Sequence, residues 1–145
     1  MLDRNIAREG TAPEFGRSLN GFGINLLVKE IDRTTTFLKE VFGMEIHRAD
    51  KDFAVLEHRG DFFQLHADHT YHDNPLPGTL EGVHHRGGGV ELRLYEEDPD
   101  ACEARAEKAG YTVLRTSLDR PHGLRECYLL DPDGYCWVPS AVLKD

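Results

Sequence analysis

The chain has 145 residues, 39% of them hydrophobic and 30% charged, a composition typical of one globular domain rather than a disordered chain. Its 26 acidic and 17 basic residues give a formal net charge of −9, which repels phosphate backbones and argues against a nucleic-acid partner. No stretch approaches the roughly 18 apolar residues of a membrane span, and the N-terminus lacks the apolar segment of a signal peptide, so we expect neither membrane insertion nor export.

Three cysteines, Cys102, Cys127 and Cys136, form no CxxC pair. Neither a disulfide framework nor a thiolate zinc site is therefore indicated, and a cytoplasmic location is expected.

Residues 1–20 mix Gly, Pro, Arg and Glu without periodicity, and we expect a leader that is mobile or docks on another surface. From Gly21 the apolar residues alternate through Val28, which predicts a strand, and residues 31–42 then follow helical spacing up to Gly43. Three short β-like runs come next, at residues 45–50, 53–58 and 61–68.

Residues 69–88 contain two prolines and several glycines and are expected to be a linker or binding loop. The same order then restarts with an alternating strand over residues 89–97. Asp98 and Pro99 are suited to cap and begin a helix, which Gly110 ends. Three more β-like runs follow, at residues 111–118, 124–131 and 135–142, the last two joined by the turn Asp131-Pro132-Asp133-Gly134.

The two halves superpose at an offset of about 68 residues, since Leu26 and Asp32 correspond to Leu94 and Asp100. This repeat predicts an α+β fold of two βαβββ modules, residues 21–68 and 89–142, within one domain of residues 21–145. One four-stranded sheet would leave a face unpaired. We therefore expect the two sheets to cup around a shared interior, with helices outside and a ligand in the interior.

Strand alternation assigns side chains to the two faces of each sheet. In the second module Val90, Leu92 and Leu94 alternate with polar residues that should face the interior. By the same rule Asn25 and Gln64 face the interior of the first module, as do Phe62 and His66, each two residues from Gln64. The predicted ligand-binding residues are Asn25, Phe62, Gln64, His66, Glu91, Arg93 and Tyr95.

Two of these residues, Glu91 and Arg93, lie two apart on one face. They could bind a carboxylate or act as an acid/base pair, but a mutually satisfied ion pair is slightly preferred. Glu91 is the best catalytic candidate; a catalytic residue is otherwise unknown. Further histidines at positions 69, 72, 84 and 85 fall in the linker and are interpreted as surface residues.

Three segments of the chain resemble a known family. The segment from Pro121 through Glu126 and Tyr128 into Asp131-Pro132-Asp133-Gly134-Tyr135 looks like the closing hairpin of the vicinal oxygen chelate superfamily, which includes glyoxalases, bleomycin-resistance proteins and extradiol dioxygenases. Residues 24–46 resemble its opening strand and helix, and residues 86–110 its midpoint. The resemblance implies the two-module fold and covers nearly all of residues 21–140.

Metal-dependent members of that superfamily carry His, Gln or Glu ligands at positions that correspond here to Gly23, Gln64, Glu91 and Val138. Because Gly23 and Val138 offer no donor atom, the resemblance is closest to the metal-free bleomycin-resistance branch, and no cofactor is expected. If a metal is bound, its ligands are predicted to be Gln64, His66 and Glu91.

We therefore expect a metal-independent protein that binds a small organic ligand, as a homodimer. Two alternatives stay open. One is a metal-dependent lyase, isomerase or dioxygenase of the same superfamily, and the other is a structural or regulatory homodimer with a vestigial cup.

Overall fold

The computed structural model describes residues 2–144, and within them the chain divides into two compact units. The first unit comprises residues up to Lys39 and Met44–Thr79, and the second comprises Glu40–Gly43 and the chain from Leu80 onward. None of the helices in the described residues is long and apolar enough to cross a membrane.

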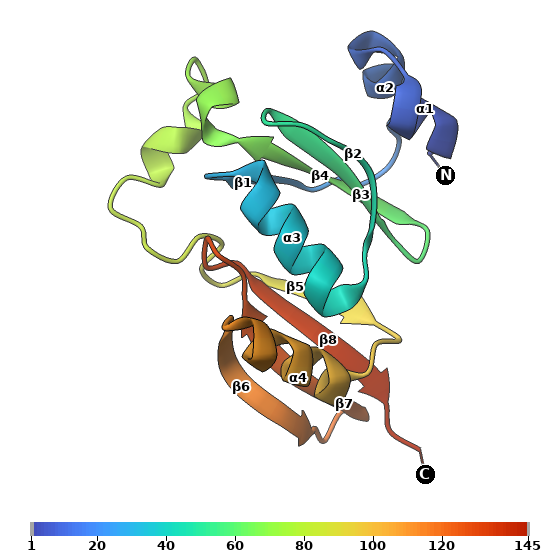
Figure 1. The fold of residues 1–145 in the computed structure, drawn as a ribbon, viewed down its shortest axis with the longest axis vertical. Coiled ribbons are helices and arrows are strands. Elements are labelled where there is room, and N and C mark those ends of the chain that lie inside the picture. Colours follow the sequence, from blue (N-terminus) through green and yellow to red (C-terminus); the bar gives the residue numbers. More distant parts are fainter. Residues whose placement is uncertain (1, 145) are drawn as a thin grey trace. The chain divides into compact units, whose positions relative to one another are not determined.

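The first unit contains a four-stranded mixed sheet in the order β1-β4-β3-β2 (Figure 1). Strand β1 (Asn25–Val28) runs parallel to β4 (Asp61–Ala67), whereas β3 (Phe53–His58) pairs antiparallel with both β4 and β2 (Glu45–Ala49). Helix α3 (Ile31–Phe42) follows β1. Its apolar stripe buries Leu38 completely, as the helical spacing predicts, and the neighbouring Phe37 is also completely buried.

The second unit repeats this order with β5 (Glu91–Tyr95), α4 (Pro99–Ala109), β6 (Thr112–Asp119), β7 (Leu124–Leu130) and β8 (Cys136–Val142). Its strand order, β5-β8-β7-β6, is the counterpart of the first sheet. The predicted α+β fold of two βαβββ modules is therefore confirmed.

Helix α4 begins and ends where its capping residues predict. The Asp98 carboxylate accepts a hydrogen bond from the Ala101 amide at 3.2 Å, Pro99 occupies the first turn, and Gly110 ends the helix with a φ of +84°. The helix buries Cys102 and Ala106 against its own unit.

The parallel strand pairs of the two modules have equivalent register. Asn25 pairs with Gln64 in the first sheet, and Arg93, which is 68 residues after Asn25, pairs with Val138 in the second. Gln64 and Val138 are therefore equivalent positions. In each sheet the face that carries these residues lies opposite the apolar face of Leu26 and Leu92, and we call it the inner face.

The N-terminal segment, expected to be a leader that is mobile or docks on another surface, is helical. It forms α1 (Arg4–Glu9) and α2 (Ala12–Ser18), which pack within the first unit beside β2 and β3. Thr11 and Glu14 form a reciprocal capping box at the start of α2. The motif Thr11-Ala12-Pro13-Glu14 was the available sequence signal for this helix.

The segment predicted as a linker also contains local structure. Two short 3₁₀ helices, η1 (Asp68–Tyr71) and η2 (Leu76–Thr79), lie within it. Their short length and lack of apolar periodicity explain why the sequence indicated only a loop.

Candidate functional site

The inner face of the second sheet carries a connected group of charged side chains. Arg93 of β5 contacts two carboxylates, with Nη1 3.1 Å from Glu91 Oε1 and Nη2 2.5 Å from Glu126 Oε2. Its guanidinium also lies over the Tyr95 ring, 5.7 Å from the centroid. The predicted pairing of Glu91 with Arg93 is present, and the structure adds Glu126 as a second partner.

Glu126 is the most buried charged residue of this face, with 4% of its side chain exposed. Besides Arg93, it lies 3.7 Å from Arg120 Nε and 3.6 Å from His122 Nε2. Burial alone would raise the pKa of the Glu126 carboxyl, but the hydrogen bond and charge of Arg93, with His122 and Arg120, hold that pKa below its usual value. Glu126 is therefore an ionised carboxylate that orients Arg93.

Sequence reasoning did not select Glu126. The sequence signal that could have selected it is the position of Glu126 within the strand-like segment from Leu124 to Leu130. Glu126 stands directly beside Cys127, which is fully buried. Ser140 also lies on this face, because its backbone pairs with both Tyr95 and Glu126. Its hydroxyl is buried and has no hydrogen-bond partner among the described residues.

The inner face of the first sheet places three predicted residues next to one another. Asn25 and Gln64 are paired across β1 and β4, and Gln64 Oε1 lies 3.1 Å from His66 Nε2. The His66 ring is stacked on Phe53 with centroids 5.8 Å apart. Burial lowers the pKa of His66, which favours a neutral imidazole.

Phe62, predicted to contact ligand, packs beneath the N-terminal helices. It lies against a small core formed by Ala7, Phe15 and Val55, and its ring is stacked on His47 at 5.3 Å. The helices α1 and α2 thus cover this part of the inner face. We call them the arm.

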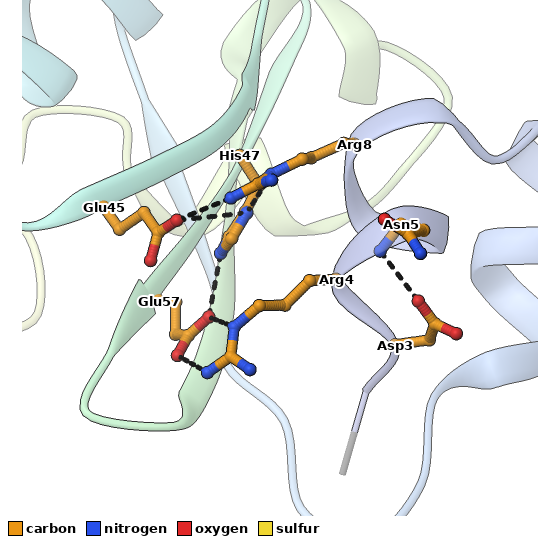
Figure 2. A network of polar contacts seen from close by, with 7 residues as sticks. All are labelled: Asp3, Arg4, Asn5, Arg8, Glu45, His47 and Glu57. Carbon is orange, nitrogen blue, oxygen red and sulfur yellow. Dashed lines mark hydrogen bonds and ion pairs between the residues drawn. The ribbon is translucent and has the colours of Figure 1, made fainter.

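A second polar cluster, which the sequence did not predict, fixes the arm to the sheet (Figure 2). Arg4 makes a bidentate ion pair with Glu57, with Nε to Oε1 2.8 Å and Nη2 to Oε2 2.6 Å. Arg8 donates to His47 Nδ1 at 3.0 Å and to Glu45 Oε1 at 2.7 Å. The Arg4 hydrogen bond lowers the pKa of Glu57 to about 2.

Glu45, His47 and Glu57 have ligand atoms within 4.8 Å of one another, but they do not fit a metal ion in this arrangement. The carboxylates lie at opposite ring nitrogens: Glu45 is 3.8 Å from Nδ1 and Glu57 is 2.8 Å from Nε2. One ion can bind only one nitrogen of a ring. Moreover, two guanidinium groups already provide the positive charge.

The remaining candidates are placed as their sequence context indicated. His69 and His72 are exposed, and His69 is hydrogen-bonded to Asp52 at 2.7 Å. Burial raises the pKa of Cys102 to about 11 and that of Cys127 to about 12, so both stay protonated thiols in their unit's core.

Residues 22–138 match the family described as the Glyoxalase/Bleomycin resistance protein/Dioxygenase superfamily. The chain belongs to this superfamily. No curated protein matches the chain.

Solved structures with the same fold include a glyoxalase/bleomycin resistance protein/dioxygenase family enzyme from Burkholderia phytofirmans PsJN, with 19% identity, a TM-score of 0.66, and coverage of 83% of this chain and 96% of that chain. A glyoxalase-related enzyme from Fulvimarina pelagi has 20% identity and a TM-score of 0.63, with coverage of 85% and 88%. TioX from Micromonospora sp. ML1 has 19% identity and a TM-score of 0.62, with coverage of 87% and 98%. At these identities the similarity shows the fold alone.

The positions that correspond to the superfamily's metal ligands offer few donor atoms in either unit. Val138 is fully buried and has no donor atom, and Gly23 precedes β1 without a side chain. Gln64 has a donor atom but already contacts His66. Glu91 is paired with Arg93, so a cation at Glu91 must first displace a guanidinium. The second unit does not fit a divalent ion as arranged.

Proposed function

We propose that the chain is a metal-independent small-molecule-binding protein of the glyoxalase/bleomycin resistance/dioxygenase superfamily. In this proposal the inner face of the second sheet contacts an organic ligand through Glu91, Arg93 and Tyr95. The face combines a guanidinium, a carboxylate and a phenol ring that is 55% exposed, which together can hydrogen-bond and stack on a planar polar molecule. Asn25, Gln64 and His66 are the proposed ligand contacts of the first unit.

The observation that carries this proposal is the position of Arg93 between Glu91 and Glu126. A metal-dependent member needs ionised side chains that are free to coordinate the ion. Here the guanidinium already neutralises both carboxylates of the face. Arg93 also has a buried anchor in Glu126, so its position is preorganised for a ligand.

Metal content and ligand binding test the proposal together. After dialysis with Mn²⁺, Zn²⁺ or Ni²⁺, elemental analysis of the wild-type chain should find well under one metal ion per chain. Arg93→Ala should bind Mn²⁺ more tightly, because it removes the guanidinium that Glu91 and Glu126 share. Arg115→Ala is the matched control, since Arg115 is an exposed arginine on β6 of the same sheet.

Ligand binding is measured by thermal shift against a chemically diverse library. A ligand present at 100 times its Kd should add about 2.7 kcal/mol to the stability. Arg93→Ala should abolish that shift and Arg115→Ala should keep it. Stoichiometric metal in the wild-type chain would contradict the proposal, as would a ligand-induced shift that survives Arg93→Ala.

The alternative, a metal-dependent lyase, isomerase or dioxygenase, is supported by one observation in the first unit. Gln64 and His66 are in contact, and burial of His66 favours the neutral form of its ring that can bind a metal. This alternative requires Glu91 as a further ligand. If Glu91→Gln leaves metal content and any detected turnover unchanged, the alternative is wrong.

A further inference from the structure

The turn between β6 and β7 presents a guanidinium and an imidazole at one end of the inner face of the second sheet. The Gly123 amide donates to the Arg120 carbonyl oxygen at 3.1 Å, and the Arg120 amide donates to the Leu124 carbonyl oxygen at 2.8 Å. Gly123 has a φ of +92°, which favours glycine, and the ring of Pro121 fixes its own φ. The turn therefore fixes the directions in which Arg120 and His122 leave the backbone.

Both side chains approach the buried carboxylate of Glu126 without a hydrogen bond to it. Arg120 Nε lies 3.7 Å from Oε1 and His122 Nε2 lies 3.6 Å from Oε2, distances that are too long for hydrogen bonds. The hydrogen bond that Glu126 accepts on this face comes from Arg93 Nη2, at 2.5 Å. Arg120 and His122 therefore contribute charge and donors to this end of the face that Glu126 does not use up.

Two buried polar groups at this end of the face lack a hydrogen-bond partner among residues 2–144. One is the Nε of Arg120, and the other is the hydroxyl of Ser140 on β8. Ser140 is completely buried and pairs with Glu126 across the strands, so it lies on the same face. Both groups can donate, and buried donors without acceptors are costly. Since 32% of the Arg120 side chain is exposed, a ligand that supplies an acceptor can reach its guanidinium.

The charges of this face differ from those of the chain as a whole, which has a net charge of −9. Two carboxylates, those of Glu91 and Glu126, are balanced by two guanidinium groups before His122 is counted. Glu91 is 43% exposed and contacts Nη1 of Arg93, whereas Glu126 contacts Nη2. A group with one negative charge is therefore tolerated beside Arg120, whereas Glu126 would repel a dianionic phosphate more strongly.

We propose that the organic ligand of the second unit carries a carboxylate, which binds Arg120 and His122 at the β6–β7 turn. This inference rests on the proposed function, because it names the class of ligand that the inner face holds. A carboxylate offers two acceptor oxygens to the planar fork of a guanidinium, and the imidazole has a ring N–H in either protonation state. Tyr95 pairs with Ser140, as Glu126 does, so its exposed ring can contact the planar part of the same ligand.

Benzoate and benzamide test this inference as a matched pair, since they share a planar ring and differ in charge. Each is titrated into the whole wild-type chain at pH 6.5, in a buffer free of phosphate and of other carboxylates. Binding is followed by ¹H–¹⁵N NMR at the Gly123 amide and at the Arg120 Nε–H, whose signal is assigned by its absence from Arg120→Gln. We expect saturable shifts with benzoate and an affinity for benzamide that is about tenfold weaker. Phenyl phosphate, the dianionic probe, should also bind more weakly than benzoate.

The Arg120→Gln variant removes the guanidinium and keeps an amide donor. Its affinity for benzoate, read at the Gly123 amide, should fall about tenfold, and its preference for benzoate over benzamide should shrink to within about twofold. His122→Gln should weaken benzoate binding by less, because the glutamine amide still donates. Arg115→Ala, at an exposed arginine of β6, should bind both compounds as the wild type does.

The results separate this inference from the proposed function. Equal wild-type affinities for benzoate and benzamide would overturn the carboxylate assignment, and this comparison does not depend on the folding of any variant. The absence of benzoate binding, tighter binding of phenyl phosphate, or benzoate binding that survives in Arg120→Gln would overturn it too. The proposed function still stands in these cases if the compound library gives a thermal shift that Arg93→Ala abolishes. It fails on different results, namely stoichiometric metal or a shift that survives Arg93→Ala.

Discussion

Glu57 in the first unit and Asp131 in the second expose little surface, 6% and 5%, yet their pKa values are shifted in opposite directions. The bidentate contact with Arg4 lowers the pKa of Glu57 to about 2. Asp131 accepts hydrogen bonds from Trp137 Nε1 and from two backbone amides, but burial outweighs them and raises its pKa to about 6. The charged partner of Glu57 outweighs the effect of burial, whereas the neutral donors around Asp131 do not.

The comparison extends to how the two units complete their inner faces. In the first unit the cations come from α1, outside the βαβββ module, and they hold the arm over the sheet. In the second unit Arg93 comes from the sheet itself, and Tyr95 and Glu91 stay exposed. One module framework therefore carries an inner face that the arm partly covers in the first unit and a partly exposed polar face in the second.

The largest effect is expected at Asp131, which ties the β7–β8 turn to Trp137. Asp131→Ala leaves the Trp137 indole and the amides of Asp133 and Tyr135 without their acceptor. We expect the free energy of unfolding of the second unit to fall by about 3–5 kcal/mol. Urea unfolding followed by the fluorescence of Trp137, the single tryptophan, measures it.

Asp131→Asn is the matched control, because its amide oxygen can still accept from the two backbone amides. Its loss should be smaller than that of Asp131→Ala. Equal losses would show that the backbone hydrogen bonds of the turn contribute little.

Asp131 also gives the second unit a defined pH dependence. Its folded pKa of about 6 lies above the ordinary value of 3.8, so its contribution to stability is greatest below about pH 4 and is lost as the pH rises through 6. The expected loss is about 2–3 kcal/mol. The wild-type unfolding free energy minus that of Asp131→Asn, measured from pH 3.5 to pH 7.5, isolates it. A difference that is flat or rises with pH would contradict the assigned shift.

The next largest loss of stability is expected at Glu126, one of the two carboxylates that contact Arg93. Glu126→Gln leaves Arg93 partly buried without its buried counter-ion, and we expect a loss of about 2–3 kcal/mol. Glu91→Gln removes a carboxylate that is 43% exposed and should cost less than about 1 kcal/mol. The same tryptophan-detected urea titration measures both. Equal costs would mean that Glu126 does not anchor Arg93.

The framework of the molecule followed from local patterns in the sequence. Strand alternation, and the caps Asp98 and Gly110 of α4, are each visible within about 15 residues of sequence. The 68-residue offset is visible because the same order of elements occurs twice. The face assignments of Asn25, Gln64 and Arg93 followed from the same alternation and agree with the strand register.

The polar clusters were not predictable in the same way, because they join residues far apart in the chain. Arg4 and Glu57 are separated by 53 residues, and Arg93 and Glu126 by 33. The capping box at Thr11 could have revealed α2, but no pattern along the chain states which surface a short helix will cover. Only the folded structure shows which of these charged residues form ion pairs.

The smallest effect on stability, and the most direct test of the comparison, is expected at Arg4. If this guanidinium decides the sign of the Glu57 shift, Arg4→Met should raise the pKa of Glu57 from about 2, in the direction that burial alone imposes on Asp131. Carboxyl-carbon NMR titration of Glu57 measures the change. Arg17→Met, at an exposed arginine of α2, should leave the Glu57 pKa where it is. A value still near 2 in Arg4→Met would assign the lowering of the Glu57 pKa to its contact with His47 instead.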